Sequence, residues 1–139
     1  MKRFLIVLLL ACASQAGAGP NVRVSIDASG EGSGLIAHAY TACLRNTPGV
    51  QVVPQVVPLG EPADAEIQIV SISMTNKAGQ ETGYAWATNV IAPDTNVELR
   101  GIHLTTIGRS RQGVFDEVAS EVLDLDRDVF ISLRNGPKN

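Results

Sequence analysis

Three closely spaced glycines, Gly30, Gly32 and Gly34, separate a predicted strand from a predicted helix in the segment SIDASGEGSGLIAHAY. Phosphate-binding loops occupy this place in many α/β proteins, because glycines let the backbone approach the phosphate closely. A dinucleotide fingerprint needs its third glycine where this chain has Leu35, and a P-loop needs a lysine that the segment lacks. Glu31 also carries the wrong charge for a phosphate site. We therefore predict a strand-to-helix connection here and no nucleotide.

A second candidate is the segment GRSRQG, in which Arg109 and Arg111 flank Ser110 directly before a predicted helix. Free backbone N–H groups at a helix start favour an anion, so these three residues are a candidate site for phosphate, sulfate or a partner's carboxylate. The alternative is that the arginines form surface ion pairs with Asp116, Glu117 or other acidic groups, each of which stabilises the protein little.

The two histidines, His38 and His103, do not form a metal site in this interpretation. His38 is predicted on the solvated side of the first helix, and His103 on the uncovered face of the sheet. A zinc site also needs a third ligand that the sequence does not offer. No Ser–His or Cys–His spacing indicates a nucleophile and base. We predict no catalytic residues, no metal and no cofactor.

The first eighteen residues have the pattern of a secretory signal. Lys2 and Arg3 precede an apolar run over 4–11 and then small residues, and the run is too short to span a bilayer. Cleavage after Ala18 satisfies the small-x-small rule, and cleavage after Ala16 is a close alternative. We expect residues 1–18 to be removed, residues 19–139 to form a single domain, and the protein to be periplasmic or secreted.

A lipid anchor is the alternative to simple cleavage. The tetrapeptide LLAC resembles a bacterial lipoprotein box, in which Cys12 would be lipidated and become the new amino terminus of an outer-membrane lipoprotein. If cleavage follows Ala18 instead, Cys43 is the only remaining cysteine, so it is either a buried thiol or the site of an intermolecular bridge.

The charge balance argues against nucleic acid as a partner. Without Lys2 and Arg3, nine of the eleven basic side chains remain against fourteen acidic ones, which is a net charge of −5. Such a surface repels phosphate backbones. After the signal, the sequence has no second long apolar run, so no transmembrane segment is expected in the mature chain.

Hydrophobic periodicity predicts the order strand, helix, four strands, helix. The predicted elements cover about 22–27, 34–46, 50–57, 65–74, 84–92, 97–107 and 114–133. Strands that alternate apolar and polar residues form a sheet with one covered face, which two amphipathic helices can cover. We expect an α+β two-layer sandwich, with a mostly antiparallel sheet of about five strands and both helices on one face.

Two strands slip phase partway along. In the third predicted strand Ile67 and Ile69 alternate in phase but Ile72 does not, and a second slip separates Leu99 from Leu104. A β-bulge at each slip would return all of these residues to the covered face.

With such bulges, the uncovered face is polar and carries Arg100 and His103, with the loop over 75–83 beside it. Lys77 and Gln80 lie in that loop. Loops beside an open sheet face are natural recognition elements, so we predict that these four residues bind a partner protein.

The closing helix has one discordant residue. Asp126 falls within the apolar stripe, so its carboxylate must be paired or the helix must bend at DLDRD. Other acidic residues of this helix are predicted to form a solvated outer side: Asp116, Glu117, Glu121, Asp124 and Asp128.

The segments VRVSID, LIAHAYTACLRNTPGVQVV, ADAEIQIVSISM and VFDEVASEVLDLDRDVFISL follow one another in an order that resembles small α+β domains of bacterial envelope proteins. Examples are the periplasmic part of the curli-secretion lipoprotein and the amino-terminal domain of the Tol-system propeller protein. The resemblance covers nearly the whole mature chain and implies a docking or assembly module, with another envelope protein as partner, and no enzyme. Two alternatives remain: a small-anion or small-ligand binding protein, and an exported inhibitor or immunity protein.

Overall fold

The computed structural model describes residues 21–55, 62–108 and 110–136 of the chain. In chain order the elements are β1 (Val22–Gly30), α1 (Ser33–Arg45), β2 (Val50–Val52), β3 (Ala65–Thr75), β4 (Glu81–Ala92), β5 (Val97–Gly108), α2 (Arg111–Leu125), the π-helical turn η1 (Asp126–Phe130) and α3 (Ile131–Asn135). The expected order of strands and helices is confirmed.

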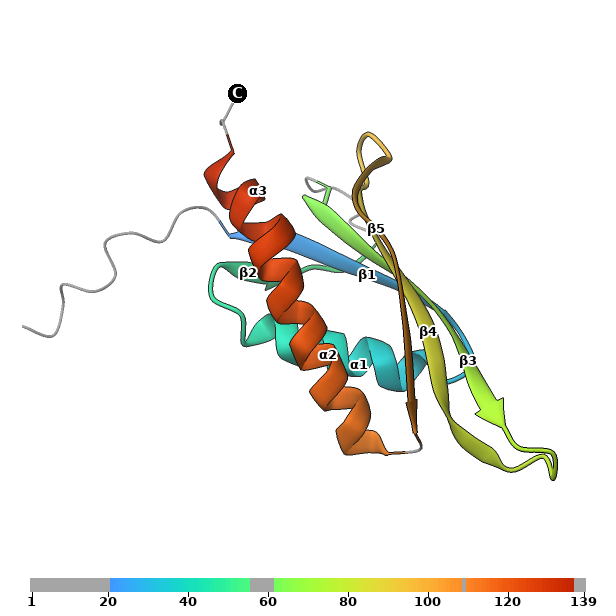
Figure 1. Cartoon of the computed structure of the whole chain (residues 1–139). Coiled ribbons are helices and arrows are strands. Elements are labelled where there is room, and N and C mark those ends of the chain that lie inside the picture. Colours follow the sequence, from blue (N-terminus) through green and yellow to red (C-terminus); the bar gives the residue numbers. More distant parts are fainter. Residues whose placement is uncertain (1–20, 56–61, 109, 137–139) are drawn as a thin grey trace, which may run out of the picture.

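The strands form one five-stranded sheet in the order β2-β1-β3-β4-β5 (Figure 1). β1 is parallel to both of its neighbours, β2 and β3, and α1 connects β1 to β2. β3, β4 and β5 form the expected antiparallel meander. The sheet is therefore mixed, and the predicted α+β sandwich is confirmed.

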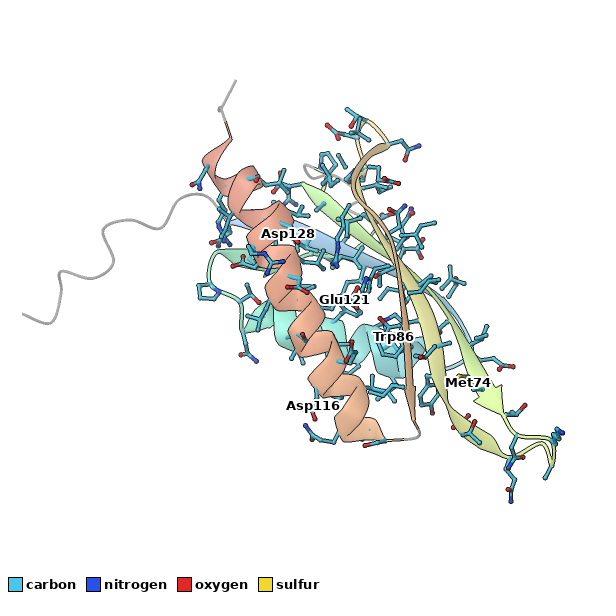
Figure 2. All side chains as sticks on the ribbon, in the orientation of Figure 1. Met74, Trp86, Asp116, Glu121 and Asp128 are labelled. Atoms are coloured by element: carbon cyan, nitrogen blue, oxygen red, sulfur yellow. The ribbon has the colours of Figure 1, made fainter. Side chains whose placement is uncertain are left out.

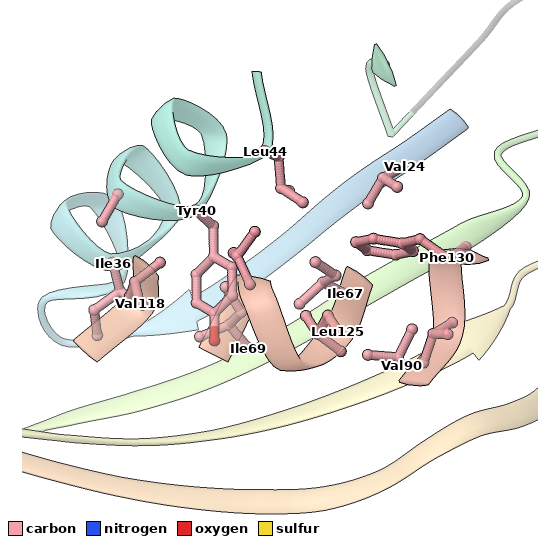
Figure 3. Close-up of a cluster of buried hydrophobic side chains, with 14 of the residues drawn as sticks. Val24, Ile36, Tyr40, Leu44, Ile67, Ile69, Val90, Val118, Leu125 and Phe130 are labelled. Carbon is pink, nitrogen blue, oxygen red and sulfur yellow. The ribbon is translucent and has the colours of Figure 1, made fainter. Parts of the chain in front are cut away.

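Both helices cover the same face of this sheet, as expected (Figure 1). Figure 3 shows the core between the layers, where Tyr40 and Leu44 of α1 meet Leu125 of α2 and Phe130 of η1 above the strands. Apolar residues of β1, β3 and β4 complete it from below, including Val24, Ile67, Ile69 and Val90. The face under the helices is hereafter the inner face, and the opposite face is the outer face.

The glycine-rich segment is a tight connection between β1 and α1. Gly30 and Gly32 have φ angles of 94° and 74°, and a Cβ at Gly30 would overlap the carbonyl oxygen of Ser71 on β3. The Glu31 carboxylate accepts hydrogen bonds from the hydroxyl of Ser73 at 2.6 Å and from its backbone N–H at 3.4 Å, which lower the pKa of Glu31. The segment is held against β3 by these contacts.

The closing helix begins at Arg111, three residues before the predicted start at 114, and its geometry changes at Asp126. The Ser110 hydroxyl accepts a hydrogen bond from the backbone N–H of Gly113 at 3.0 Å and so caps α2. At Asp126 the α-helix gives way to the π-helical turn, and the Asp126 carboxylate pairs with Arg134 at 2.7 Å. Arg134 also donates to the carbonyl oxygen of Pro48 at 2.9 Å, which ties α3 to the turn before β2. Of the two predicted alternatives, the pairing of Asp126 occurs, and the helix changes there from α- to π-helical geometry.

The predicted bulge near Ile69 and Val70 does not form. β3 pairs with β4 in unbroken register from Glu66 to Met74, and its only irregularity lies between Met74 and Thr75. Alternation therefore continues through the phase slip, so Val70 and Ile72 point away from the helices. In β5 the register does shift, opposite Val90, but this shift does not bring Leu104 inward.

Candidate protein-binding surface

The two phase slips place apolar side chains together on the outer face. Val70 lies opposite Ala87 of β4, and Ala87 lies opposite Leu104 of β5, so these three form one row across three strands. The next row contains Ile72 and Ala85. We call these five residues the outer apolar patch.

The large residues of the outer apolar patch are strongly exposed. The exposed fractions are 59% for Val70 and Ile72 and 76% for Leu104, and the adjoining Ile102 is 73% exposed. None of the five patch residues carries a charge. Single exposed apolar residues are common, but a contiguous group on one sheet face indicates a surface that binds another molecule. The patch was not predicted, because the assumed bulges placed Val70, Ile72 and Leu104 on the covered face.

β5 forms an open edge beside the patch. It is the last strand in the sheet. Residues 101–104 are all exposed, so the side chains on both faces of the strand are uncovered there. Edge strands usually carry lysine, proline or inward-pointing charge that discourages pairing. In β5 the charged residues Glu98 and Arg100 lie in its first half, and the stretch GIHLTTIG over 101–108 has no lysine, proline or acidic or basic charge.

The β3–β4 hairpin extends past the helices and carries two of the predicted partner-binding residues at its tip (Figure 1). The side-chain oxygen of Asn76 accepts hydrogen bonds from the backbone N–H groups of Ala78 and Gln80, at 2.9 and 3.0 Å. The Asn76 amide also donates to the Gln80 side chain at 3.0 Å. Lys77 is exposed at this ordered tip. The binding roles of Lys77 and Gln80 remain predictions.

Arg100 and His103 do not lie on the outer face, which corrects the predicted placement. The register sets Arg100 opposite Val90 and His103 opposite Thr88, and both of those β4 residues are buried under α2. Arg127 and, to a smaller extent, Arg100 lower the pKa of Asp128, so Arg100 acts on the helix side. The predicted placement assumed a single bulge in β5, whereas the register shifts on both sides of Val90 and so keeps His103 on the inner face.

The predicted anion site is described only in part. The Ser110 hydroxyl is the cap of α2 and therefore already satisfies the N–H of Gly113. Arg111 is exposed at the first position of that helix, and Arg109 lies outside the described residues. Anion binding by Arg109, Ser110 and Arg111 remains a prediction.

A buried polar cluster lies under α2. Glu121 was predicted on the solvated side of the helix, yet only 4% of it is exposed, because it lies three residues from Val118 and four from Leu125 on the buried stripe. Its carboxylate accepts a hydrogen bond from the hydroxyl of Thr88 on β4. Figure 2 shows Glu121 directed from the helix toward the sheet that carries Trp86.

Other buried polar atoms of this cluster are unsatisfied within the described part of the chain. The Tyr40 hydroxyl, the Trp86 indole N–H, the Thr105 hydroxyl and the second oxygen of Glu121 have no hydrogen-bond partner among the described residues. Burial, followed by the negative charge of Glu121, raises the pKa of Tyr40 far above its usual value. The cluster therefore holds the carboxyl group of Glu121 and a neutral phenol together in the core.

The cysteine and histidine side chains of the described residues form no metal-binding group. Cys43 is a partly buried thiol whose pKa is raised by burial, and Cys12 lies outside the described residues. His38 contacts the ring of Phe115 edge-on, with 5.8 Å between the ring centres. Within 21–55, 62–108 and 110–136, no group of three or more His, Cys, Asp or Glu side chains is placed to hold a metal ion.

The helices of the described residues are all too short or too polar to cross a bilayer. The signal peptide, its cleavage site and the lipoprotein box lie outside the described residues and remain predictions.

Comparison with known proteins places this fold among solved structures. No protein-family model matches the sequence, and no curated protein matches it. The PelC dodecamer from Paraburkholderia phytofirmans is similar, with a TM-score of 0.55 and 12% identity over 75% of this chain and 91% of the PelC chain. A dodecamer of a PelC variant from the same organism gives 0.52, with 11% identity over 75% and 88% of the two chains.

A protein from Xanthomonas campestris assigned to the DUF330 family model is also similar. Its TM-score is 0.53, with 8% identity over 76% of this chain and 85% of that protein. Since identities this low establish the fold alone, the chain shares the PelC and DUF330 architecture. The resemblance to the curli-secretion and Tol-system domains remains a prediction.

Proposed function

We propose that this protein is an exported, non-enzymatic module of the bacterial cell envelope that assembles with another protein through the outer face of its sheet. The observation that carries the proposal is the outer apolar patch, where Val70, Ile72 and Leu104 are more than half exposed on a single face. Burying this uncharged surface against a partner releases ordered water and is favourable.

Two further observations support a role in assembly. The β3–β4 hairpin that carries Lys77 and Gln80 extends past the helices and offers a second contact region (Figure 1). The solved PelC structures with the same fold are dodecamers, so this architecture is compatible with assembly into large complexes. The secretory pattern of residues 1–18 supports the envelope location.

An exported inhibitor or immunity protein would use the same surface against an enzyme. No described feature favours that alternative over an assembly partner. A small-anion binding protein would instead use Arg109, Ser110 and Arg111, and its test is given in the Discussion.

The location is tested by expressing the full chain in a Gram-negative host, fractionating the cells and measuring the intact mass of the product. We expect a periplasmic or outer-membrane protein that has lost residues 1–18, or one that begins at a lipidated Cys12. A cytoplasmic product that retains its first eighteen residues would contradict the proposal.

The binding surface is tested in the same cells with a photoreactive amino acid at position 70 or 77. We expect covalent adducts from Val70 and Lys77, because both side chains are exposed on the proposed surface. Leu123 on α2, which is 72% exposed, is the matched control position. Equal adduct yields from all three positions would overturn the assignment of this surface.

A further inference from the structure

We infer that the free edge of β5 binds the β5 edge of a second copy of this chain, as an antiparallel pair centred on Leu104. This inference rests on the proposed function and names a partner for the same surface. Across the pair, the sheets of the two copies would join into one.

The unpaired backbone groups of an open strand edge favour another strand as the partner. β5 extends over Val97–Gly108 and has β4 as its neighbour on one side, with no other strand of the described chain on its free side. Backbone N–H and C=O groups that point outward from an edge are satisfied in full by another extended segment. The exposure of residues 101–104 leaves that edge accessible.

The lengths of the two edge strands favour pairing of β5 with a second β5 over pairing of β5 with β2. The other edge, β2, covers only Val50–Val52, so a head-to-tail pair of β5 with β2 would engage about three residues. Two β5 strands can pair along most of their twelve residues. A twofold-symmetric contact between identical edges closes at the dimer, whereas a head-to-tail contact builds a ring or an open filament.

The side-chain alternation restricts the register of this pair. Residues directly opposite each other share a face, so Leu104 of the outer face must lie opposite another outer-face residue. Centring the pair on Leu104 sets this residue opposite its own copy. A shift by one residue would set it opposite His103, which lies opposite the buried Thr88 and belongs to the inner face.

The apolar pattern and the charge distribution fit this register. The row formed by Val70, Ala87 and Leu104 would continue into Leu104, Ala87 and Val70 of the second copy as one apolar band. The stretch over 101–108 carries no charged side chain, so two identical copies meet without like charges at the centre of the pair.

Light scattering on the purified protein, combined with size-exclusion chromatography, tests the association. We expect a species of at least twice the chain mass at concentrations up to about 100 µM, where micromolar association is populated. Leu104→Lys places two positive charges opposite each other at the twofold axis, so it should raise the dissociation constant about tenfold or more, equivalent to about 1.4 kcal/mol.

Leu123→Lys is the matched control for this variant. It makes the same change at a leucine of similar exposure, 72% against 76%, on the solvent side of α2. We expect it to leave the association unchanged. A wild-type chain that is monomeric throughout, or an oligomer that L104K and L123K affect equally, would overturn the inference.

Disulfide cross-linking tests the register. In a Cys43→Ser background, Leu104→Cys should give a covalent dimer under mild oxidation, because opposite residues have Cβ atoms about 5 Å apart. Val97→Cys, at an exposed position of the same strand, should not form a covalent dimer. Position 97 lies seven residues from the axis in each copy, so the two cysteines would be roughly 45 Å apart. Cross-linking through Val97 and not through Leu104 would refute the register.

The two proposals fail in distinguishable ways. A protein that is exported and cross-links to other envelope proteins but remains monomeric contradicts only the self-association. A protein that dimerises through Leu104 but retains residues 1–18 in the cytoplasm contradicts only the envelope function.

Discussion

The two faces of the sheet each carry residues that depart from the usual rule. The inner face packs an apolar core against the helices, but the buried carboxylate of Glu121 and the hydroxyls of Tyr40 and Thr88 lie between these layers. The outer face, which no helix covers, exposes Val70 and Leu104. Buried carboxylates and clustered exposed apolar residues both lower the stability or solubility of an isolated domain. Substitutions on the two faces should therefore differ in their effects on stability and on association.

The largest effect should come from comparing two isoleucines of β3 that lie on opposite faces. Ile69→Ala, on the inner face, should lower the free energy of unfolding by about 2–5 kcal/mol, because it leaves a cavity in the core. Ile72→Ala, on the outer face, should change it by less than about 0.5 kcal/mol in the monomer. Urea unfolding of both variants at low protein concentration measures the difference. Equal losses would mean that the outer face is covered in solution.

A smaller effect is expected inside the polar cluster, where two buried threonines provide a matched pair. Thr88→Val removes the hydrogen bond to Glu121 and leaves its carboxylate without that donor, so it should destabilise the protein by about 1–3 kcal/mol. Thr105→Val removes a buried hydroxyl that has no partner in the described chain, so it should be neutral or stabilising.

The double variant Thr88→Val with Glu121→Leu sharpens this result. Replacing both partners by apolar side chains removes the uncompensated carboxylate, so the double variant should recover most of the stability lost in Thr88→Val alone. If its unfolding midpoint stays at or below that of the single variant, the carboxylate contributes in a way that the contact with Thr88 does not explain.

The pH dependence of stability tests the environment of Tyr40. Its pKa in the folded protein is raised above the value of about 10 for an unfolded chain, so stability is fully present below pH 10 and falls as the unfolded tyrosine ionises. This residue should contribute a loss of about 1.4 kcal/mol per pH unit above pH 10.

Urea unfolding at pH 9, 10 and 11 measures this contribution. Tyr40→Phe should remove it, whereas Tyr84→Phe, at the partly exposed tyrosine of β4, should retain it. The same alkaline slope in the wild type and in Tyr40→Phe would argue against the buried, neutral phenol.

The smallest expected effect concerns the anion prediction at the start of α2. If Arg109, Ser110 and Arg111 bind phosphate or sulfate at millimolar concentration, the ligand should raise the melting temperature by about 2 °C when its concentration equals its dissociation constant. Arg111→Ala should abolish the shift, and Arg45→Ala, at an exposed arginine on α1, should not. No shift in the wild type at tens of millimolar phosphate would exclude the site.

Much of the architecture follows from local pattern. The 3.6-residue period of the two helices, the alternation in β4 and the stop at Pro48 and Gly49 predict the order of elements and the layer that the helices form. The Ser110 cap and the pairing of Asp126 were also predictable, because each depends on residues within one or two helical turns. The positions of Lys77 and Gln80 at a hairpin tip follow from the polar loop between two strands.

What the sequence could not decide is the face on which each slipped residue lies. A phase slip is compatible either with a bulge or with a strand that exposes its second apolar set, and only the pairing of β3 with β4 selects the latter for Val70 and Ile72. The same holds for Leu104, Arg100 and His103, whose faces depend on the register shift opposite Val90. The local sequence thus determines which elements form, because propensity and periodicity act over a few residues. The tertiary structure decides which apolar residues form the outer apolar patch, because cross-strand register depends on residues far apart in the chain.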